Sequence, residues 1–114
     1  MAFQPETKDE LQAAVDLWIV DSTTTIETYG AINTWDVSLI TDMSSLFQNY
    51  HTFNSDISSW DVSNVTNMYR MFRSATSFNQ DLSSWDVSSV TNMDQMFRDA
   101  TSFNQDLSSW DVSN

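Results

Sequence analysis

The sequence predicts a short right-handed α/β solenoid, with a parallel sheet on one side, short helices on the other and a capping helix at its N-terminus. The main observation is a 25-residue repeat in which Trp35, Trp60, Trp85 and Trp110 each open the tetrapeptide Trp-Asp-Val-Ser. A fixed period of this length indicates one supersecondary unit stacked on copies of itself. The other two observations are a change of apolar spacing within each repeat and an amphipathic segment before the first one.

The N-terminal segment, residues 1–31, does not fit the repeat and predicts a capping helix followed by a connector. Thr7 and Glu10 have the spacing of a capping box, and apolar residues follow at helical intervals. We expect a helix over residues 8–20 that covers the first repeat, because the ends of a solenoid need a lid. Residues 21–28 are polar and threonine-rich, and we expect them to form the connector.

The repeats occupy the remainder of the chain. We divide it into three full copies and a partial fourth, at residues 32–56, 57–81, 82–106 and 107–114. A unit of 25 residues that cannot bury its own apolar face must stack on its neighbours. Recurring columns of Trp, Val, Met and Phe are therefore expected to form the core, with aromatic rings that face inward from coil to coil.

Each repeat is expected to contain a strand, a turn, a short helix and a return loop. Trp85 and Val87 are two residues apart, as on one face of a strand, which predicts a strand over residues 82–88. From Val90 to Ala100 the apolar residues have helical spacing, and Thr91 is a candidate N-cap.

Asparagine is expected to make tight turns, because the chain contains one glycine and one proline. Asn54, Asn79 and Asn104 recur shortly before each new repeat. Asparagine tolerates the left-handed backbone better than other non-glycine residues, so we interpret these three as turn residues. Hydrogen bonds from one asparagine to the next along the stack are a further expectation.

Composition argues against several classes of function. The chain carries 16 acidic and 4 basic residues, so it lacks the basic stripe that nucleic-acid binding requires. Arg73 and Arg98 occupy one repeat column, and we expect them to pair with nearby acids such as Asp99. No apolar run is long enough for a transmembrane helix, and no cysteine is present. His51 is the single histidine, and no nucleophile, zinc or phosphate-binding motif stands out, so we expect no enzyme.

Two aspartate columns are the candidates for a functional site. The first consists of Asp36, Asp61, Asp86 and Asp111, and the second of Asp56, Asp81 and Asp106. On a parallel sheet, neighbouring carboxylates of the first column would lie roughly 4.8 Å apart and repel one another. They are therefore candidate calcium ligands, because calcium prefers carboxylate oxygens. The alternative for both columns is that each carboxylate accepts hydrogen bonds from the following turn.

The exposed face of the sheet would combine these carboxylates with small hydroxyl groups. Its predicted binding residues are Ser59, Asp61, Ser63, Ser84, Asp86, Ser88, Ser109 and Asp111. A face that repeats from coil to coil suits a repetitive partner, such as a protein or glycan at a cell surface, better than one small molecule. A regular hydroxyl grid also suits an ice or mineral surface, which stays open as a separate class of function.

The C-terminal end carries no second lid. The sequence stops shortly after Val112, where another helix is expected, and the exposed apolar edge predicts end-to-end self-association. Two functions are consistent with these features. One is a non-catalytic interaction or adhesion module that is a fragment of a longer repeat protein. The other is a structural protein whose coils stack end to end or through cations.

One motif recurs almost unaltered, Trp85-Asp86-Val87-Ser88 followed in the same copy by Ser102-Phe103-Asn104-Gln105. It resembles the 25-residue repeat of BspA-like surface proteins, found in mycoplasma lipoproteins and in other bacterial and protist proteins. The resemblance covers residues 32–114, and the first copy departs most, with Tyr50 where later copies have alanine. It implies a leucine-rich-repeat-like solenoid, a cell-surface or extracellular location and adhesion or partner binding, and no catalytic residues.

Overall fold

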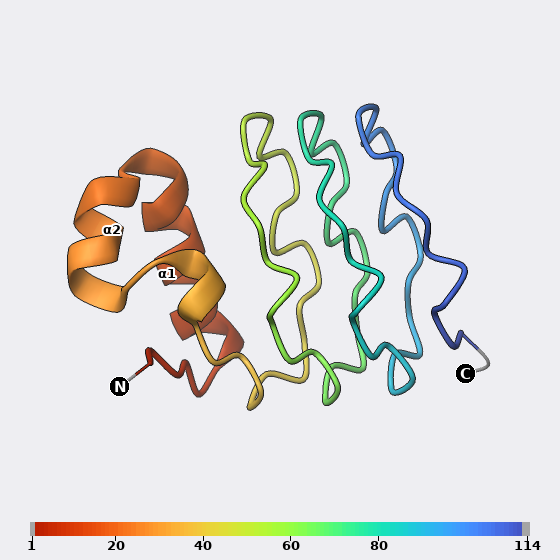
Figure 1. Ribbon diagram of the computed structural model, residues 1–114, viewed down its shortest axis with the longest axis horizontal. Helices are drawn as coiled ribbons and strands as arrows, with labels where there is room; N and C mark the ends of the chain where they lie inside the picture. Colours follow the sequence, from red (N-terminus) through yellow and green to blue (C-terminus); the bar gives the residue numbers. More distant parts are fainter. Residues whose placement is uncertain (1, 113–114) are drawn as a thin grey trace.

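The computed structural model describes residues 2–112, as two N-terminal helices followed by a row of stacked coils (Figure 1). Helix α1 spans Lys8–Val20, helix α2 spans Ser22–Tyr29, and a single 3₁₀ turn, η1, spans Ile32–Thr34. The rest of the chain forms turns and loops in which residues 25 apart bond to each other. The helices lie at one end of the row and the C-terminus at the other.

The predicted α/β solenoid is wrong, and so is its leucine-rich-repeat interpretation. Residues 2–112 contain no strand and no sheet, and their only β-pairing is two isolated parallel bridges, Asp42 with Asn67 and Asn67 with Asn92. The helix expected from Val90 to Ala100 is also absent. The coils nevertheless stack, because other hydrogen bonds join them.

The helix predicted over residues 8–20 is confirmed, and Thr7 caps it by accepting a hydrogen bond from the Glu10 amide at 3.2 Å. The Glu10 carboxylate accepts from the Glu6 amide, one residue earlier than in a standard capping box. The threonine-rich segment is not a connector but helix α2. Asp21 caps this helix, because its carboxylate accepts hydrogen bonds from both the amide and the hydroxyl of Thr24.

Helix α1 covers the first coil. Its Leu11 side chain is fully buried. Gln12 Nε2 donates to the Leu46 carbonyl at 3.0 Å, and Trp18 Nε1 donates to Ser55 Oγ at 3.1 Å. The helix therefore buries apolar surface and also provides donors for polar groups that the first coil directs toward this end.

The segment predicted to be helical is a ribbon of successive β-turns, and we call residues 42–50, 67–75 and 92–100 the turn ribbon. Alternate amides bond within the coil, as the Leu46 amide does to the Met43 carbonyl. The amides between them bond to the next coil, as the Phe47 amide does to the Met71 carbonyl at 2.9 Å. A helix would use its amides internally and leave none to join the coils.

The turn ribbon requires left-handed residues at two positions of every coil. The non-glycine residues with positive φ are Ser45, Asn49, Arg70, Ser74, Gln95 and Asp99, at φ values from 54° to 65°. Asn54, Asn79 and Asn104 are not among them, so their predicted left-handed role is wrong. Their other expected role is confirmed: the amides of Asn79 and Asn104 each donate to the asparagine Oδ1 of the preceding coil at 2.9 Å.

The tryptophans face inward, as expected. Trp35, Trp60 and Trp85 are each 3% exposed, and the rings of Trp35 and Trp60 stack with their centroids 6.4 Å apart. The indole of Trp60 donates to the Ile32 carbonyl at 2.8 Å, and that of Trp85 to the Ile57 carbonyl at 3.0 Å. Buried side chains thus make the connections between coils that backbone pairing would make in the predicted strand over residues 82–88.

Two phenylalanine columns fill the rest of the core. Phe47 and Phe72 stack at 5.4 Å, and Phe53 and Phe78 stack at 5.6 Å, with interplanar angles of 10° and 4°. Each ring therefore packs on its own copy in the neighbouring coil, and every coil depends on the next one for burial of its core.

Replacing Trp85 by Phe removes an indole N–H and leaves the buried Ile57 carbonyl without that donor. We expect the free energy of unfolding in urea to fall by about 1–3 kcal/mol. The matched control is Trp110→Phe, because Trp110 makes the same bond to Leu82 at 2.9 Å but is only partly buried. The free energy of unfolding should fall less in Trp110→Phe, since water can donate to the Leu82 carbonyl in place of the indole. Equal losses would contradict the role assigned to the buried bond.

Replacing Ser74 by Gly relieves a left-handed backbone at φ 59°. Ser77→Gly is the control, because Ser77 is not among the residues with positive φ. We expect the glycine at position 74 to leave the protein about 1 kcal/mol more stable than the glycine at position 77. Urea unfolding of the two variants measures the difference, and a ranking in the opposite sense would show that the turn ribbon is not left-handed there.

Candidate functional site

Aspartates cap tight turns along the first predicted column, which we call the Asp86 row: Asp36, Asp61, Asp86 and Asp111. Asp61 Oδ1 accepts hydrogen bonds from the amide of Ser63 at 3.0 Å and from its hydroxyl at 2.6 Å. Asp36 and Asp86 hold the serines two residues later in the same way. The alternative in which the carboxylate supports the following turn is therefore confirmed for these three residues.

The second column, which we call the Asp81 row, is Asp56, Asp81 and Asp106, and it has the same chemistry. Each carboxylate uses Oδ1 to accept the amide of the serine two residues later, at 2.8–2.9 Å. The chain segments that carry the row run side by side (Figure 1), and Ser84 Oγ joins two of them by donating to the Ser58 carbonyl at 3.0 Å. The hydroxyl of Ser58 also donates to Asp56 Oδ1, at 2.7 Å, and the hydroxyls of Ser83 and Ser108 bond to the carboxylates of Asp81 and Asp106.

A third column of capped turns was not predicted from the sequence. Asp42, Asn67 and Asn92 each accept, through a side-chain oxygen, the amide two residues later at 2.8–2.9 Å. The sequence could have predicted these capped turns, because all three residues are short side chains with an oxygen acceptor at one repeat position. The column is less evident than the others because it contains both Asp and Asn. These turns start the turn ribbon in each coil.

Hydrogen bonds from the following serine favour the ionised form of five aspartates in the first two rows. The hydroxyl and then the amide of the following serine lower the pKa of Asp36, Asp56, Asp86 and Asp106 below the ordinary value of 3.8. The pKa of Asp81 is lowered first by the Ser83 amide and then by its hydroxyl. The carboxylates of Asp106 and Asp56 oppose this shift.

A shallow hollow of about 320 Å³ lies at the Asp81 row. It is lined by Asp81, Ser83, Gln105, Asp106, Ser108 and Ser109. The wall is held in place, because Gln105 Nε2 donates to Asn79 Oδ1 at 2.9 Å and Ser109 Oγ donates to the Ser83 carbonyl at 3.1 Å. Two carboxylates of neighbouring coils thus meet in one recess, with amide and hydroxyl groups around them.

The predicted binding face is divided by the structure into structural serines and outward carboxylates. The hydroxyls of Ser59, Ser84 and Ser109 donate to carbonyls of the preceding coil. The hydroxyls of Ser63 and Ser88 donate to the aspartates two residues before them. The serines therefore stabilise turns and coil contacts, and Asp61, Asp86 and Asp111 are the exposed charged side chains of this face.

A metal site is not assembled by the described side chains. Among residues 2–112, no group of three or more His, Cys, Asp or Glu side chains is arranged to hold a metal ion. Calcium binding by Asp36, Asp61, Asp86 and Asp111 therefore stays a prediction from the sequence.

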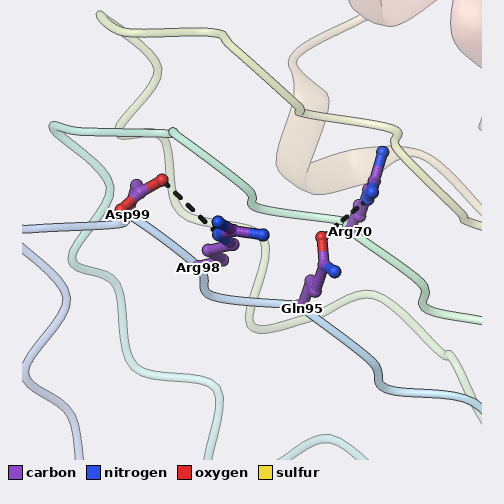
Figure 2. A network of polar contacts seen from close by, with 4 residues as sticks. All are labelled: Arg70, Gln95, Arg98 and Asp99. Atoms are coloured by element: carbon purple, nitrogen blue, oxygen red, sulfur yellow. Dashed lines mark hydrogen bonds and ion pairs between the residues drawn. The ribbon is translucent and has the colours of Figure 1, made fainter.

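Arginines lie on the turn ribbon, where they contact its side chains (Figure 2). Arg70 Nε donates to Gln95 Oε1 at 2.8 Å, and the Arg70 guanidinium lies 4.7 Å from the centre of the Tyr69 ring. Arg98 and Asp99 form the expected pair at 3.8 Å, and both side chains are more than half exposed. For Arg73 the expected pairing is wrong, because its Nε is buried and has no hydrogen-bond partner among residues 2–112. Such exposed pairs contribute about 1 kcal/mol or less.

Comparison with known proteins gives one match. Residues 9–114 fit a family model described as "Mycoplasma protein of unknown function, DUF285", a family associated with BspA-like repeat proteins. No curated protein and no solved structure matches the chain. Between residues 2 and 112, the helices are too short or too polar to cross a bilayer.

Acid should destabilise this protein through the capping aspartates. The pKa values of Asp56, Asp81, Asp86 and Asp106 are lower in the folded chain than the ordinary 3.8, so ionisation of these four favours the folded state above that value. This stability is lost as the pH falls through the folded pKa values. We expect the urea midpoint to decrease as the pH falls from about 4 toward 2, with a weaker dependence in Asp81→Asn. A midpoint that rises over this interval would contradict the assignment.

Proposed function

The chain belongs to the DUF285 family of Mycoplasma proteins, and on that premise we propose that it is a non-catalytic interaction module that binds a repetitive, basic protein partner at a cell surface. The observation that carries the proposal is the Asp81 row. Its carboxylates recur once per coil, each exposed and each with Oδ1 bound by the amide of its own turn. A ligand with cationic groups at matching intervals can contact several of them at once.

Charge supports a basic partner. The formal net charge is −12, and a negative surface attracts cationic ligands and accelerates their association. The recess between Asp81 and Asp106 presents two carboxylates side by side, with Gln105 at its wall. A guanidinium or ammonium group placed there would offset the repulsion from Asp106 and Asp56, which opposes the lowering of the pKa of Asp81. Each bound cation thus gains two partners.

The state of the aspartates supports a binding role over catalysis. A general acid at neutral pH needs a raised pKa, whereas the serine contacts lower the pKa of Asp81, Asp86 and Asp106. Their repetition in successive coils also favours an extended binding surface over one reaction centre. Display at a cell surface is supported by the resemblance of the repeat to BspA-like surface proteins.

The alternative of an assembly protein whose coils stack end to end receives less support. Helix α1 occupies the end of the first coil, where Gln12 donates to Leu46 and Lys8 Nζ donates to Ser44 Oγ at 2.9 Å. A second copy would have to displace these contacts in order to continue the stack. The end-to-end filament therefore conflicts with the packing of the helices.

The proposal predicts that an oligolysine peptide binds through the Asp81 row. The test variant is Asp56→Asn/Asp81→Asn/Asp106→Asn, and the control is Asp9→Asn/Glu27→Gln/Asp94→Asn, which removes the same charge elsewhere. Calorimetric titration at about 0.15 M salt should show roughly tenfold weaker binding for the test variant than for the control, about 1.4 kcal/mol.

Equal weakening in both variants would mean that net charge alone attracts the peptide, which contradicts a built site. Binding of a panel of neutral glycans without binding of the peptide would replace the basic protein by a glycan as partner. Circular dichroism and urea unfolding of both variants establish that each is folded before binding is compared.

A further inference from the structure

The basic residues of this acidic chain are gathered on the turn ribbon. The chain has 4 basic residues against 16 acidic ones. Arg70, Arg73 and Arg98 belong to the ribbon itself, and Lys8 Nζ donates to the hydroxyl of Ser44, another ribbon residue, at 2.9 Å. The Asp81 row and the Asp86 row belong to the other run of each coil. The bases and the acidic rows therefore occupy different segments of the repeat.

Two of these arginines do not neutralise the acidic residues of the chain. Among residues 2–112, the one ion pair is that of Arg98 with Asp99, which lies within the turn ribbon. Arg70 and Arg73 pair with no carboxylate in this part of the chain, although 16 acidic residues are present in the sequence. An arginine that only offsets charge is expected beside a carboxylate. Their positive charge is therefore open to a group outside the chain.

The Arg70 side chain is held in a fixed orientation (Figure 2). Its Nε donates to Gln95 Oε1 of the next coil at 2.8 Å, and its guanidinium lies 4.7 Å from the centre of the Tyr69 ring. Its two Nη atoms have no hydrogen-bond or ion-pair partner among residues 2–112. The edge that these two atoms form carries two parallel N–H groups, an arrangement that binds both oxygens of a carboxylate.

Arg73 lies beside Arg70, because the two residues are the ends of one β-turn. The Arg73 amide donates to the Arg70 carbonyl at 3.2 Å. The Arg73 Nε is buried and has no hydrogen-bond partner among residues 2–112, which costs about 1–3 kcal/mol. A negative group bound at the ribbon surface would offset part of this cost, because the charge of a guanidinium is spread over all its nitrogens. Arg73 therefore reinforces an anion site at Arg70.

Tyr69 and Arg70 are not part of the repeat. The same two positions hold serines in the first coil and Asp94 and Gln95 in the third. The backbone does not require the arginine, because Arg70 and Gln95 share a left-handed conformation, at φ 54° and 56°. Residues that support this fold recur from copy to copy, whereas this pair occurs once. Tyrosine and arginine are also the residue types that contribute most to protein–protein contacts.

The surroundings of Arg70 favour a single carboxylate over a polyanion. The Arg70 amide donates to the carbonyl of Asp94 at 3.1 Å, so an exposed aspartate lies nearby. With a formal net charge of −12, the chain repels phosphate-rich polymers and anionic membranes. One carboxylate brings a single negative charge and matches the free edge of Arg70. The half-buried Tyr69 ring offers an apolar contact beside it.

We propose that Arg70, reinforced by Arg73, binds the carboxylate of an acidic side chain in a protein segment whose neighbouring apolar side chain packs against Tyr69. The contact is separate from the Asp81 row, because it selects a negative group where the row selects a positive one. It therefore goes beyond the proposed function and does not rest on it.

A peptide titration followed by NMR tests the proposal. The probe is acetyl-Ala-Phe-Glu-Phe-Ala-amide, which carries one carboxylate between two apolar side chains, and its control is the same peptide with Gln in place of Glu. We expect the backbone amide signals of residues 67–75 to shift with a Kd of about 1 mM for the acidic peptide. The Gln peptide should bind roughly tenfold more weakly, because it lacks the negative charge.

The test variant is Arg70→Gln, and the matched control is Arg98→Gln, which removes the same charge from the same ribbon. Glutamine is compatible with both positions, because Gln95 and Gln48 stand in the same repeat columns. Arg70→Gln should bind the acidic peptide roughly tenfold more weakly than the wild type. Arg98→Gln should bind it within about twofold of the wild type, because Asp99 already holds Arg98. Circular dichroism establishes that both variants are folded.

Several results would overturn the carboxylate site. Equal binding by Arg70→Gln and the wild type is one, and equal binding of the Glu and Gln peptides is another, since an apolar contact alone would explain it. Tighter binding of inorganic phosphate or of a short heparin fragment would replace the carboxylate by a polyanion. The absence of any shift up to about 20 mM peptide would also overturn it. Loss of binding in the Asp56→Asn/Asp81→Asn/Asp106→Asn variant would move the peptide to the Asp81 row.

Discussion

Hydrogen bonding between consecutive coils is the constraint on which the rest of this structure depends. Buried backbone amides and carbonyls must find partners, and a chain without sheet has to find them by other means. This protein uses alternate amides of the turn ribbon, the indole of each later tryptophan, and serine, threonine and asparagine side chains. All of these bonds join one coil to the next. The coils are therefore held in register without a continuous β-ladder.

The aromatic core follows from that register. Because equivalent residues lie above one another, phenylalanine stacks on phenylalanine and tryptophan on tryptophan, at centroid distances of 5.4–6.4 Å. A ring is covered only when a further layer lies on each side of it. At one end helix α1 supplies that layer, with Trp18 packed edge-on against Trp35. Helix α1 thus closes the core beside the first coil.

The acidic rows are a consequence of the same turns. An aspartate that caps a serine turn has to be ionised and near the surface, and the repeat brings equivalent carboxylates into a row. Repulsion along the Asp81 row is tolerated because the serine contacts lower the pKa more than the neighbouring charges raise it. The turns of this row therefore place one exposed carboxylate in each coil. The surface proposed to bind and the turns that shape it are made of the same residues.

Several features were determined by the sequence alone. The period of 25 residues, the inward tryptophans, the helix over residues 8–20 and the capping role of the first aspartate column could be predicted, because each depends on local chemistry or on repetition. The conformation inside the repeat could not. Apolar residues three apart suit both a helix and a turn ribbon, and the choice depends on whether amides bond within the coil or to the next one.

Tertiary contacts decided the remaining features, because these depend on which hydrogen bonds form within a coil and which form to the next coil. The asparagines bond across coils instead of adopting a left-handed backbone. The left-handed positions are occupied by residues such as Ser74 and Arg70, which have no particular preference for that conformation. The carboxylates of Asp56 and Asp106 oppose the lowering of the pKa of Asp81, which likewise requires that the coils bring them near one another. A sequence specifies which groups recur, but only the neighbouring coil determines which of them meet.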